Sequence, residues 1–553
     1  MKLRLIIGAI SISGASLALA CSSTNTITDF GEDAGSSGTS GTSGKSSSGT
    51  SGASGGTSGS SGSSGSSGTS GTSGSSGSSG SSGTSGSSGT SGSSGSAPKN
   101  VKLKAGSSQG IIGVTTDAAP HVVYYVENGA NLDVEAAPVA GGAPVVLQAS
   151  IGDNDFAFVS GGAVAWYTNT DVAQTGIATA INIWTKAAGK KTVTAPTRSG
   201  IFAGSPDGTL VSFSTNATAT TTDVAVTTAA APSVATPVLA GANAINYAAI
   251  AGCAPRIRFA GTTLVGAYCT GVDAAATTAR LVTVASGGAA VVRVDNAVAA
   301  SSIQPLFFAD NTGTKLFVVG PAPTNEGRVV VANGATTTVG AVDSAVTAVD
   351  VAKDGSAVVY TAGGALKKAS FAAVPVITPI VATGVLKLLG MTPDSKKAMY
   401  STLTNSDPNF ELTDAKIVDV TVAVPAPVAI VAAATGANYQ FTGSATHVVY
   451  LDEVGAASAK AKSKPVAGGA EKVLDPASLG VFAAPAGTAV LSLTAVSQAD
   501  DSWTLKYVDG VAGGALQAGA SDVFADDWLW SGKTFLHTNI GAAAPGIYAL
   551  TLP

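Results

Sequence analysis

Short apolar runs recur along the C-terminal four-fifths of the chain, and a polar turn precedes each of them. The clearest examples are SPDGTLVSFST, which begins at Ser205, and TPDSKKAMYST, which begins at Thr392. Val, Ile, Thr, Tyr and Phe dominate these runs, as is typical of β-strands, and Gly and Asp-Gly steps separate them. Despite the many alanines, no long window shows the spacing of an amphipathic helix. The pattern therefore predicts an all-β domain.

The hexapeptide PVAGGA occurs twice, beginning at Pro138 and at Pro465, and a valine-leucine step follows both copies. Upstream of each copy lie a turn, the tetrapeptide HVVY and an acidic step. These surroundings read DAAPHVVYYVENG from Asp117 and GSATHVVYLDEVG from Gly443. Because the surroundings match as well, the two hexapeptides should occupy the same place in two copies of one structural unit.

The unit recurs in weaker form, so that ten turn-and-strand signals occur at spacings of about 40 to 53 residues. Such a period is typical of β-propellers, in which four-stranded blades bury their faces by stacking around an axis. We expect about eight to ten blades in one propeller, or two smaller propellers. A first strand near Val101–Leu103, or at Gly110–Val114, would complete the last blade and close the ring. The eight other signals begin at Ser160, Ser205, Ala260, Asp310, Lys353, Thr392, Pro485 and Ser531.

The SPDG turn followed by an apolar strand resembles the repeats of TolB-like and WD40-like propellers of the bacterial envelope. The resemblance is specific at Ser205–Gly208, Lys353–Gly355 and Thr392–Asp394, and it extends in degenerate form over most of residues 110–553. It implies a propeller of the cell envelope. The N-terminal helical domain of the best-known member has no counterpart in this sequence, so that protein's own partners are not carried over.

The N-terminus has the layout of an export signal, with two basic residues, an apolar stretch and small residues before Cys21. It resembles a bacterial lipoprotein signal at residues 1–20, although Leu17 lies one place earlier than in that family. The resemblance implies acylation of Cys21 and, with Ser22 next, an outer-membrane lipoprotein of a Gram-negative bacterium that faces the periplasm or the surface. Buried acyl chains, at about 0.8 kcal/mol per CH₂, would anchor it stably. An ordinary secretory signal with a chance cysteine is the alternative.

Three further regions follow the signal. Residues 21–33 form a short mature N-terminus, residues 34–98 are almost entirely Gly, Ser and Thr, and residues 99–553 carry the propeller repeats. The middle segment lacks apolar side chains to offset the entropy of ordering, so we expect a disordered tether. As a flexible coil it reaches about 40–50 Å, enough to hold a domain away from a membrane.

The charge of the chain limits the expected partners, and its cysteines bear on whether a disulfide forms. Charged residues make up 11% of the chain and the formal net charge is −5, so nucleic acid is not expected as a partner. Cys253 and Cys269 flank two short predicted strands, and counting outward from Gly261 places them opposite each other. Opposite residues of an antiparallel hairpin lie within disulfide reach, and export favours oxidation. We expect a Cys253–Cys269 disulfide, whereas a one-residue bulge would favour two free buried thiols.

Residues suited to metal binding or acid-base chemistry are sparse. The three histidines, His121, His447 and His537, lie at or within strand signals, and their spacing supports no metal site. Asp153-Asn154-Asp155 resembles a fragment of a calcium loop, but it lacks the glycine and distal glutamate of the full pattern and favours a turn. We therefore expect no cofactor and no metal, and we assign no catalytic residue.

Acidic pairs beside tryptophans are the one candidate for ligand binding. Asp500-Asp501 and Asp526-Asp527 lie near three of the five tryptophans. Acidic groups beside exposed aromatic rings can bind sugars or cations. Alternatively, the tryptophans pack between blades and the acidic side chains lie in solvated turns. The candidate ligand-binding residues are Trp503, Asp526, Asp527, Trp528 and Trp530.

Two classes of function fit these features. The first is a monomeric, non-enzymatic binding or scaffold module, held on the membrane by its N-terminal lipid, which meets envelope proteins, peptidoglycan or polysaccharide through its loops. The second is an enzyme that processes extracellular carbohydrate or a lactone in the central channel. Such an enzyme needs converging Asp, Glu, His or Arg residues, and their scarcity favours the first class.

Overall fold

The computed structural model describes residues 97–553 with several gaps. The predicted signal peptide, the acylation of Cys21, the short mature N-terminus and nearly all of the linker lie outside the described residues and stay predictions. Every regular element described is a β-strand. In the part of the chain that the structure describes, no helix has the length and apolarity needed to cross a membrane. The gaps are 107, 130, 152–156, 169–176, 199–200, 219–220, 234–236, 244–255, 271–277, 287, 298–305, 321–323, 408–409, 424, 435–437 and 453–457.

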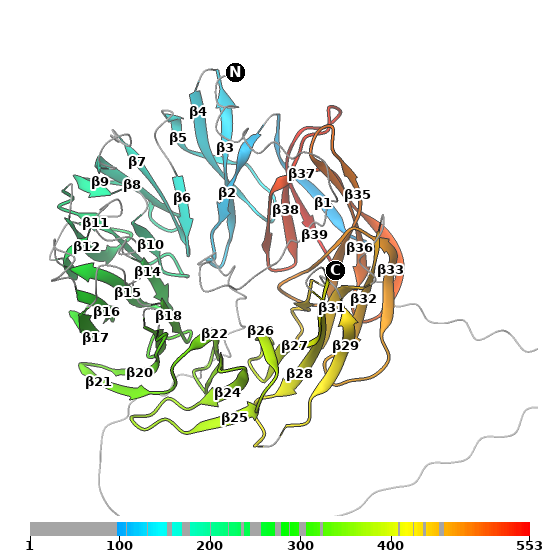
Figure 1. Ribbon diagram of the computed structural model, residues 1–553. Coiled ribbons are helices and arrows are strands. Elements are labelled where there is room, and N and C mark those ends of the chain that lie inside the picture. Colours follow the sequence, from blue (N-terminus) through cyan, green and yellow to red (C-terminus); the bar gives the residue numbers. More distant parts are fainter. Residues whose placement is uncertain are drawn as a thin grey trace, which may run out of the picture. The chain divides into compact units, whose positions relative to one another are not determined.

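The strands form ten four-stranded antiparallel blades that follow one another around a ring (Figure 1). In the first five blades, the strands run from the innermost to the outermost as follows: β2 (Ser108–Val114), β3 (His121–Asn128), β4 (Asn131–Pro138) and β5 (Val145–Ile151); β6 (Ala157–Ser160), β7 (Ala163–Thr168), β8 (Ile177–Thr185) and β9 (Gly189–Arg198); β10 (Phe202–Gly204), β11 (Leu210–Thr215), β12 (Thr221–Thr228) and β13 (Leu239–Asn243); β14 (Arg256–Ala260), β15 (Thr263–Thr270), β16 (Thr278–Val284) and β17 (Ala290–Ala297); β18 (Leu306–Ala309), β19 (Lys315–Val319), β20 (Gly327–Asn333) and β21 (Thr336–Ala341).

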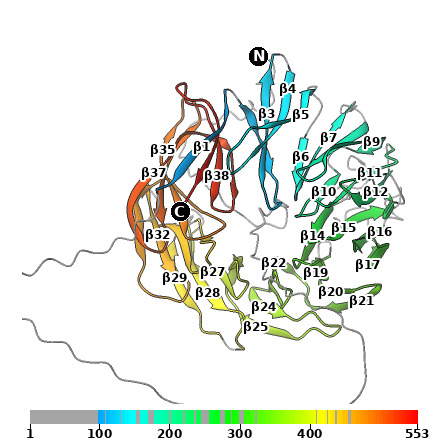
Figure 2. The same cartoon turned by 180° about the vertical axis from the view of Figure 1, so that it is seen from behind.

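The other five blades continue the same order from innermost to outermost strand. The view from behind shows most of their strands on the left of the ring (Figure 2). They are β22 (Val346–Val351), β23 (Val358–Ala362), β24 (Ala365–Ala369) and β25 (Ile377–Val381); β26 (Val385–Met391), β27 (Lys397–Asp407), β28 (Phe410–Asp419) and β29 (Val428–Ala434); β30 (Gln440–Phe441), β31 (His447–Asp452), β32 (Ala459–Pro465) and β33 (Lys472–Ser478); β34 (Gly480–Ala483), β35 (Ala489–Ser497), β36 (Ser502–Asp509) and β37 (Gly513–Ser531); then the end of β37 with β38 (Thr534–Asn539), β39 (Gly546–Thr551) and β1 (Lys99–Ala105).

Strand β37 belongs to two blades. Its first part pairs with β36 as the outermost strand of the ninth blade, from Gly513 to Phe524. Its last part pairs with β38 from Trp528 to Ser531 and is the innermost strand of the tenth blade. The ninth and tenth blades therefore form one continuous sheet of seven strands.

The N-terminal strand closes the ring. β1 pairs antiparallel with β39, from Lys99 opposite Thr551 to Ala105 opposite Gly546, so Val101–Leu103 is the closing strand and Gly110–Val114 belongs to the innermost strand of the first blade. Ten clusters of buried apolar residues lie one between each pair of neighbouring blades. One of them joins Leu103 and Ile547 of the last blade to Val122 of the first. The predicted propeller is confirmed as a single ring of ten blades.

The two PVAGGA copies lie at the same place in the first and eighth blades, as predicted. Pro138 pairs with His121 and Pro465 pairs with His447, so each hexapeptide forms the hairpin between the third and fourth strands. In both hairpins the first glycine donates its backbone N–H to the proline carbonyl. The first glycine has φ of 94° in one copy and 89° in the other, a conformation that only glycine adopts without strain.

The turn between the first and second strands also repeats. Ser205 and Thr392 each accept a hydrogen bond on the side-chain hydroxyl from the backbone N–H five residues later, and Asp207 and Asp394 accept further bonds from within their turns. Neighbouring turns are bonded to each other, since Gly443 donates its N–H to the carbonyl of Ala484 in the next blade. We call this end of the ring the turn face and the opposite end the loop face.

Candidate functional site

Three tryptophans meet between the ninth and tenth blades. Trp503 of β36 and Trp528 of β37 have ring centroids 6.2 Å apart, and Phe482 of β34 contacts both, at 5.8 and 5.2 Å. Trp530 lies 5.1 Å from Phe535, which stacks on Trp528 at 5.5 Å. The structure therefore brings together the three tryptophans that the sequence singled out, and we call the three tryptophans and Phe482 the tryptophan cluster.

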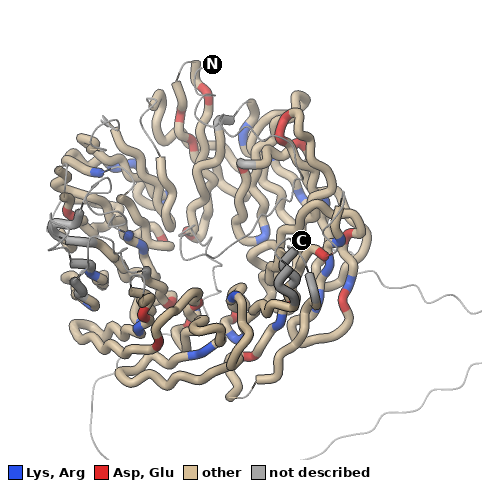
Figure 3. The backbone as a smooth tube through the Cα atoms, in the orientation of Figure 1, with Lys and Arg blue, Asp and Glu red and all other residues tan. Residues whose placement is uncertain are grey.

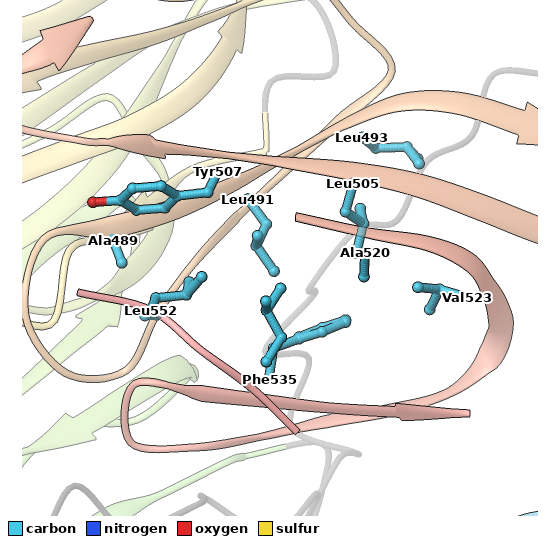
Figure 4. Packing of buried hydrophobic residues seen from close by; sticks show 11 residues of the cluster. Ala489, Leu491, Leu493, Leu505, Tyr507, Ala520, Val523, Phe535 and Leu552 are labelled. Atoms are coloured by element: carbon cyan, nitrogen blue, oxygen red, sulfur yellow. The ribbon is translucent and has the colours of Figure 1, made fainter. Parts of the chain in front are cut away.

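The tryptophan cluster covers a buried apolar layer and is itself only partly buried. Beneath it lie Leu491, Leu505 and Phe535, which Figure 4 shows converging from three strands. The three tryptophans and Phe482 pack on this layer while keeping part of their surface in solvent. The structure thus has features of both interpretations of the tryptophans. The rings pack between blades, and they also present apolar surface to solvent.

An acidic hairpin adjoins the tryptophan cluster at the loop face. Asp500 and Asp501 lie in the hairpin between β35 and β36, and Ser502 separates them from Trp503. Ala525 donates its N–H to the carbonyl of Asp501 at 2.9 Å. The hydroxyls of Ser497 and Ser502 lower the pKa of Asp500 by hydrogen bonding to its carboxylate. The Asp500 carboxylate is therefore ionised at neutral pH, in the hairpin that leads into the strand of Trp503.

Of the second acidic pair, Asp527 has a structural role. Its side chain is 8% exposed, and its carboxylate accepts the backbone N–H of Ile111 at 2.5 Å and the hydroxyl of Thr538. Asp527 thereby joins the innermost strand of the tenth blade to that of the first. Asp526 lies in β37, but its side chain is outside the described part of the structure, so its role as a ligand-binding residue stays a prediction.

Polar side chains of other innermost strands make the same kind of contact with the next blade. Asp350 accepts the N–H of Met391 at 2.8 Å. Gln440 accepts the N–H of Ala483 at 2.7 Å and donates to the carbonyl of Val481 at 3.0 Å. These polar side chains of the innermost strands therefore hydrogen bond to backbone groups of the next blade. Among the described residues, no three His, Cys, Asp or Glu side chains gather as metal ligands would, and Figure 3 shows acidic and basic residues interspersed around the ring.

Two of the three histidines, His121 and His537, are buried, and His447 is partly buried. Burial lowers the pKa of His121, His447 and His537, and in His537 it lowers the pKa to about 4. His121 is hydrogen bonded through Nδ1 to the carbonyl of Ala119 at 2.7 Å and meets the ring of Trp184 edge-on. All three are therefore neutral at pH 7.

The described part of the Cys253–Cys269 hairpin has a register that differs by one residue from the predicted one. Ala260 pairs with Thr263 across a turn centred between Gly261 and Thr262, and Arg256 pairs with Ala267. Cys253 lies outside the described residues, and only the backbone of Cys269 is described, in β15. The disulfide stays a prediction.

A cleft of about 410 Å³ lies between the sixth and seventh blades at the turn face. Sequence reasoning missed it, because two repeats contribute short turn segments that no motif links. Among the described residues that line the cleft, Lys368 is the one with a charge. The other lining residues are Ser356, Ala357, Ala369, Ser370, Val376, Thr378, Ser395, Val420 and Thr421.

The chain matches no protein-family model and no curated protein. Among solved structures, it is similar to a eukaryotic initiation factor at 12% identity, covering 68% of this chain and 90% of that chain, with a TM-score of 0.43. TolB from Acinetobacter baumannii is 8% identical, with 53% and 80% covered and a TM-score of 0.25. Oligogalacturonate lyase from Vibrio parahaemolyticus is 12% identical, with 53% and 87% covered and a TM-score of 0.31. At these values the likeness carries no statement about function.

Proposed function

We propose that this protein is a non-enzymatic binding module of the bacterial cell envelope. It is anchored by a lipid on Cys21, and its propeller binds a glycan at the tryptophan cluster. The observation that carries the proposal is the packing of the partly exposed Trp503 and Trp528 next to the hairpin that carries the ionised carboxylate of Asp500. Aromatic rings supply flat apolar surface, and a carboxylate accepts hydrogen bonds from sugar hydroxyls.

Two further features support a binding role over the alternative of a carbohydrate- or lactone-processing enzyme. Asp350 and Asp527, the carboxylates that the structure describes on innermost strands, accept backbone N–H groups of the next blade. A general acid or base must instead reach the substrate. The tryptophan cluster also rests on a preformed apolar layer, so little side-chain ordering opposes binding.

The test is a fluorescence titration of the soluble mature chain, residues 22–553, with envelope polysaccharides and peptidoglycan fragments. Three of the five tryptophans lie in the cluster, so binding there should change the emission. Trp503→Ala should weaken binding about fivefold, because a lost aromatic contact costs roughly 1 kcal/mol. Trp503→Tyr keeps an aromatic face and is the matched control.

Two other results would contradict the proposed glycan-binding function. If no glycan changes the emission and a stoichiometric protein is captured instead, the ligand class is wrong. If a glycan or lactone is turned over by the wild-type chain, the enzymatic alternative replaces the binding role.

A further inference from the structure

The cleft between the sixth and seventh blades offers hydrogen-bond donors along its wall. Lys368 donates one N–H of its ammonium group to the carbonyl of Val420 at 2.6 Å, and an ammonium has three. The hydroxyl oxygen of Ser370 accepts the N–H of Val376, and that of Ser395 accepts the N–H of Lys353. Because a serine hydroxyl can both accept and donate, these two O–H groups can donate to an acceptor in the cleft. A carboxylate fits this arrangement.

Exposed apolar side chains lie in and beside the wall of the cleft. Val376 lines the cleft and is 68% exposed. Val374, at 83%, and Val422, at 46%, lie within two residues of lining residues, in the hairpin between β24 and β25 and in the segment between β28 and β29. Exposed apolar side chains that lie close together favour a contact surface. The chemistry suits a short extended segment with one carboxylate flanked by apolar side chains.

The chain itself contains such a segment. Between Cys21 and Ala97, Ile27 and Phe30 are the only large apolar residues, and Asp29 lies between them in the sequence TITDF. The surrounding residues 22–33 carry three acidic side chains and no basic one. This composition differs from the Gly, Ser and Thr that follow, and a pure spacer would not require it.

The described part of the chain begins on the face that carries the cleft. Lys99 at the start of β1 pairs with Thr551, and Leu552 donates its N–H to the carbonyl of Lys533. Lys533 lies in the turn between β37 and β38, which is the turn face of the last blade. A chain with the length and composition of residues 34–96 would reach about 40–50 Å if it behaved as the coil expected from the sequence.

We propose that the segment Thr26–Phe30 docks into the cleft between the sixth and seventh blades of its own chain. Asp29 binds the Lys368 ammonium and the serine hydroxyls, and Ile27 and Phe30 cover Val376. The occupied cleft folds the tether back, which holds the turn face near the anchored N-terminus and directs the loop face outward.

Photo-crosslinking tests this docking in the soluble mature chain, residues 22–553. With benzoylphenylalanine in place of Phe30, crosslinks should map by mass spectrometry to residues 370–378 and 420–422. Lys368→Glu and Val376→Asp should each lower the yield about tenfold, the effect of losing a charge-assisted hydrogen bond or a comparable apolar contact. Val473→Asp is the matched control, because Val473 is 50% exposed on the eighth blade, away from the cleft.

Two results would overturn the proposal. Crosslinks to other surfaces, or yields that the two cleft variants leave unchanged while their circular dichroism matches wild type, would show that the cleft does not hold this segment. Crosslinks that join isotopically light and heavy chains would show that the segment binds a second copy. A crosslinker in place of Ser60, in the middle of the linker, should give no preferred site in any case.

Discussion

At the scale of single residues, His537 shows how the packing between strands controls ionisation. Its ring stacks on Phe535 at 5.7 Å and on Tyr548 at 5.6 Å, and burial lowers its pKa from 6.5 to about 4. Between these two values the unfolded chain binds a proton that the folded chain excludes. Stability therefore falls as the pH falls from 6.5 to 4, and it is unaffected by this group at higher pH.

Replacing His537 with Phe should remove most of this dependence. A lowering from 6.5 to about 4 corresponds to roughly 3 kcal/mol of unfolding free energy at pH 4, at about 1.4 kcal/mol per pKa unit. Urea unfolding of wild type and His537→Phe at pH 7 and at pH 4.5 measures the effect. Equal losses of stability in the two proteins would show that His537 is not the group responsible, and His121, whose pKa is lowered in the same direction, would be tested next.

At the scale of elements, the sequence predicted the second strand of every blade. The ten signals correspond to β3, β7, β11, β15, β19, β23, β27, β31, β35 and β38. Each strand follows a short turn, and in several of these turns, such as those before β11 and β27, a side chain bonds the backbone of the turn itself. The innermost strands were less visible, since β10 has three residues and β30 has two. Runs this short carry no periodicity. The double membership of β37 was also not foreseen, because its second half pairs with strands of a different blade.

The contacts between neighbouring turns lead to a prediction about glycine. A Cβ at Gly443 would collide with the backbone of Ala486 in the next blade, and backbone cannot move aside as a flexible side chain can. Gly443→Ala should therefore destabilise the protein by about 2–4 kcal/mol, as overpacking does. Thermal unfolding measures the loss.

Gly480→Ala is the control for this experiment. The same atom at Gly480 would lie 3.4 Å from Leu493, an ordinary contact, and neither glycine is among those with positive φ. Gly480→Ala should change stability by less than about 1 kcal/mol. Similar effects of the two substitutions would mean that the turns do not pack as closely as the structure indicates.

At the scale of the whole molecule, the blade number and the closure of the ring follow from contacts that a single sequence only suggests. The repeat spacing left one propeller or two possible. The choice depends on apolar residues from distant segments, such as Leu103 with Val122 and Ile547. The tryptophan cluster could be anticipated because its members lie close in sequence. The cleft could not, because it forms only when two blades stack.

The closure of the ring by β1 leads to a last prediction. Leu103 is 6% exposed in the cluster that joins the last blade to the first. Leu103→Asp would bury a carboxylate there and should detach β1, at a cost of about 3–5 kcal/mol. The amides of β39 that bond to β1 should then exchange with solvent far faster, which hydrogen exchange detects, whereas Asn100→Asp, at an exposed position of the same strand, should leave them protected. If the β39 amides stay protected in Leu103→Asp, the first and last blades hold the ring closed without the N-terminal strand, and their own contact through Asp527 and Ile111 is sufficient.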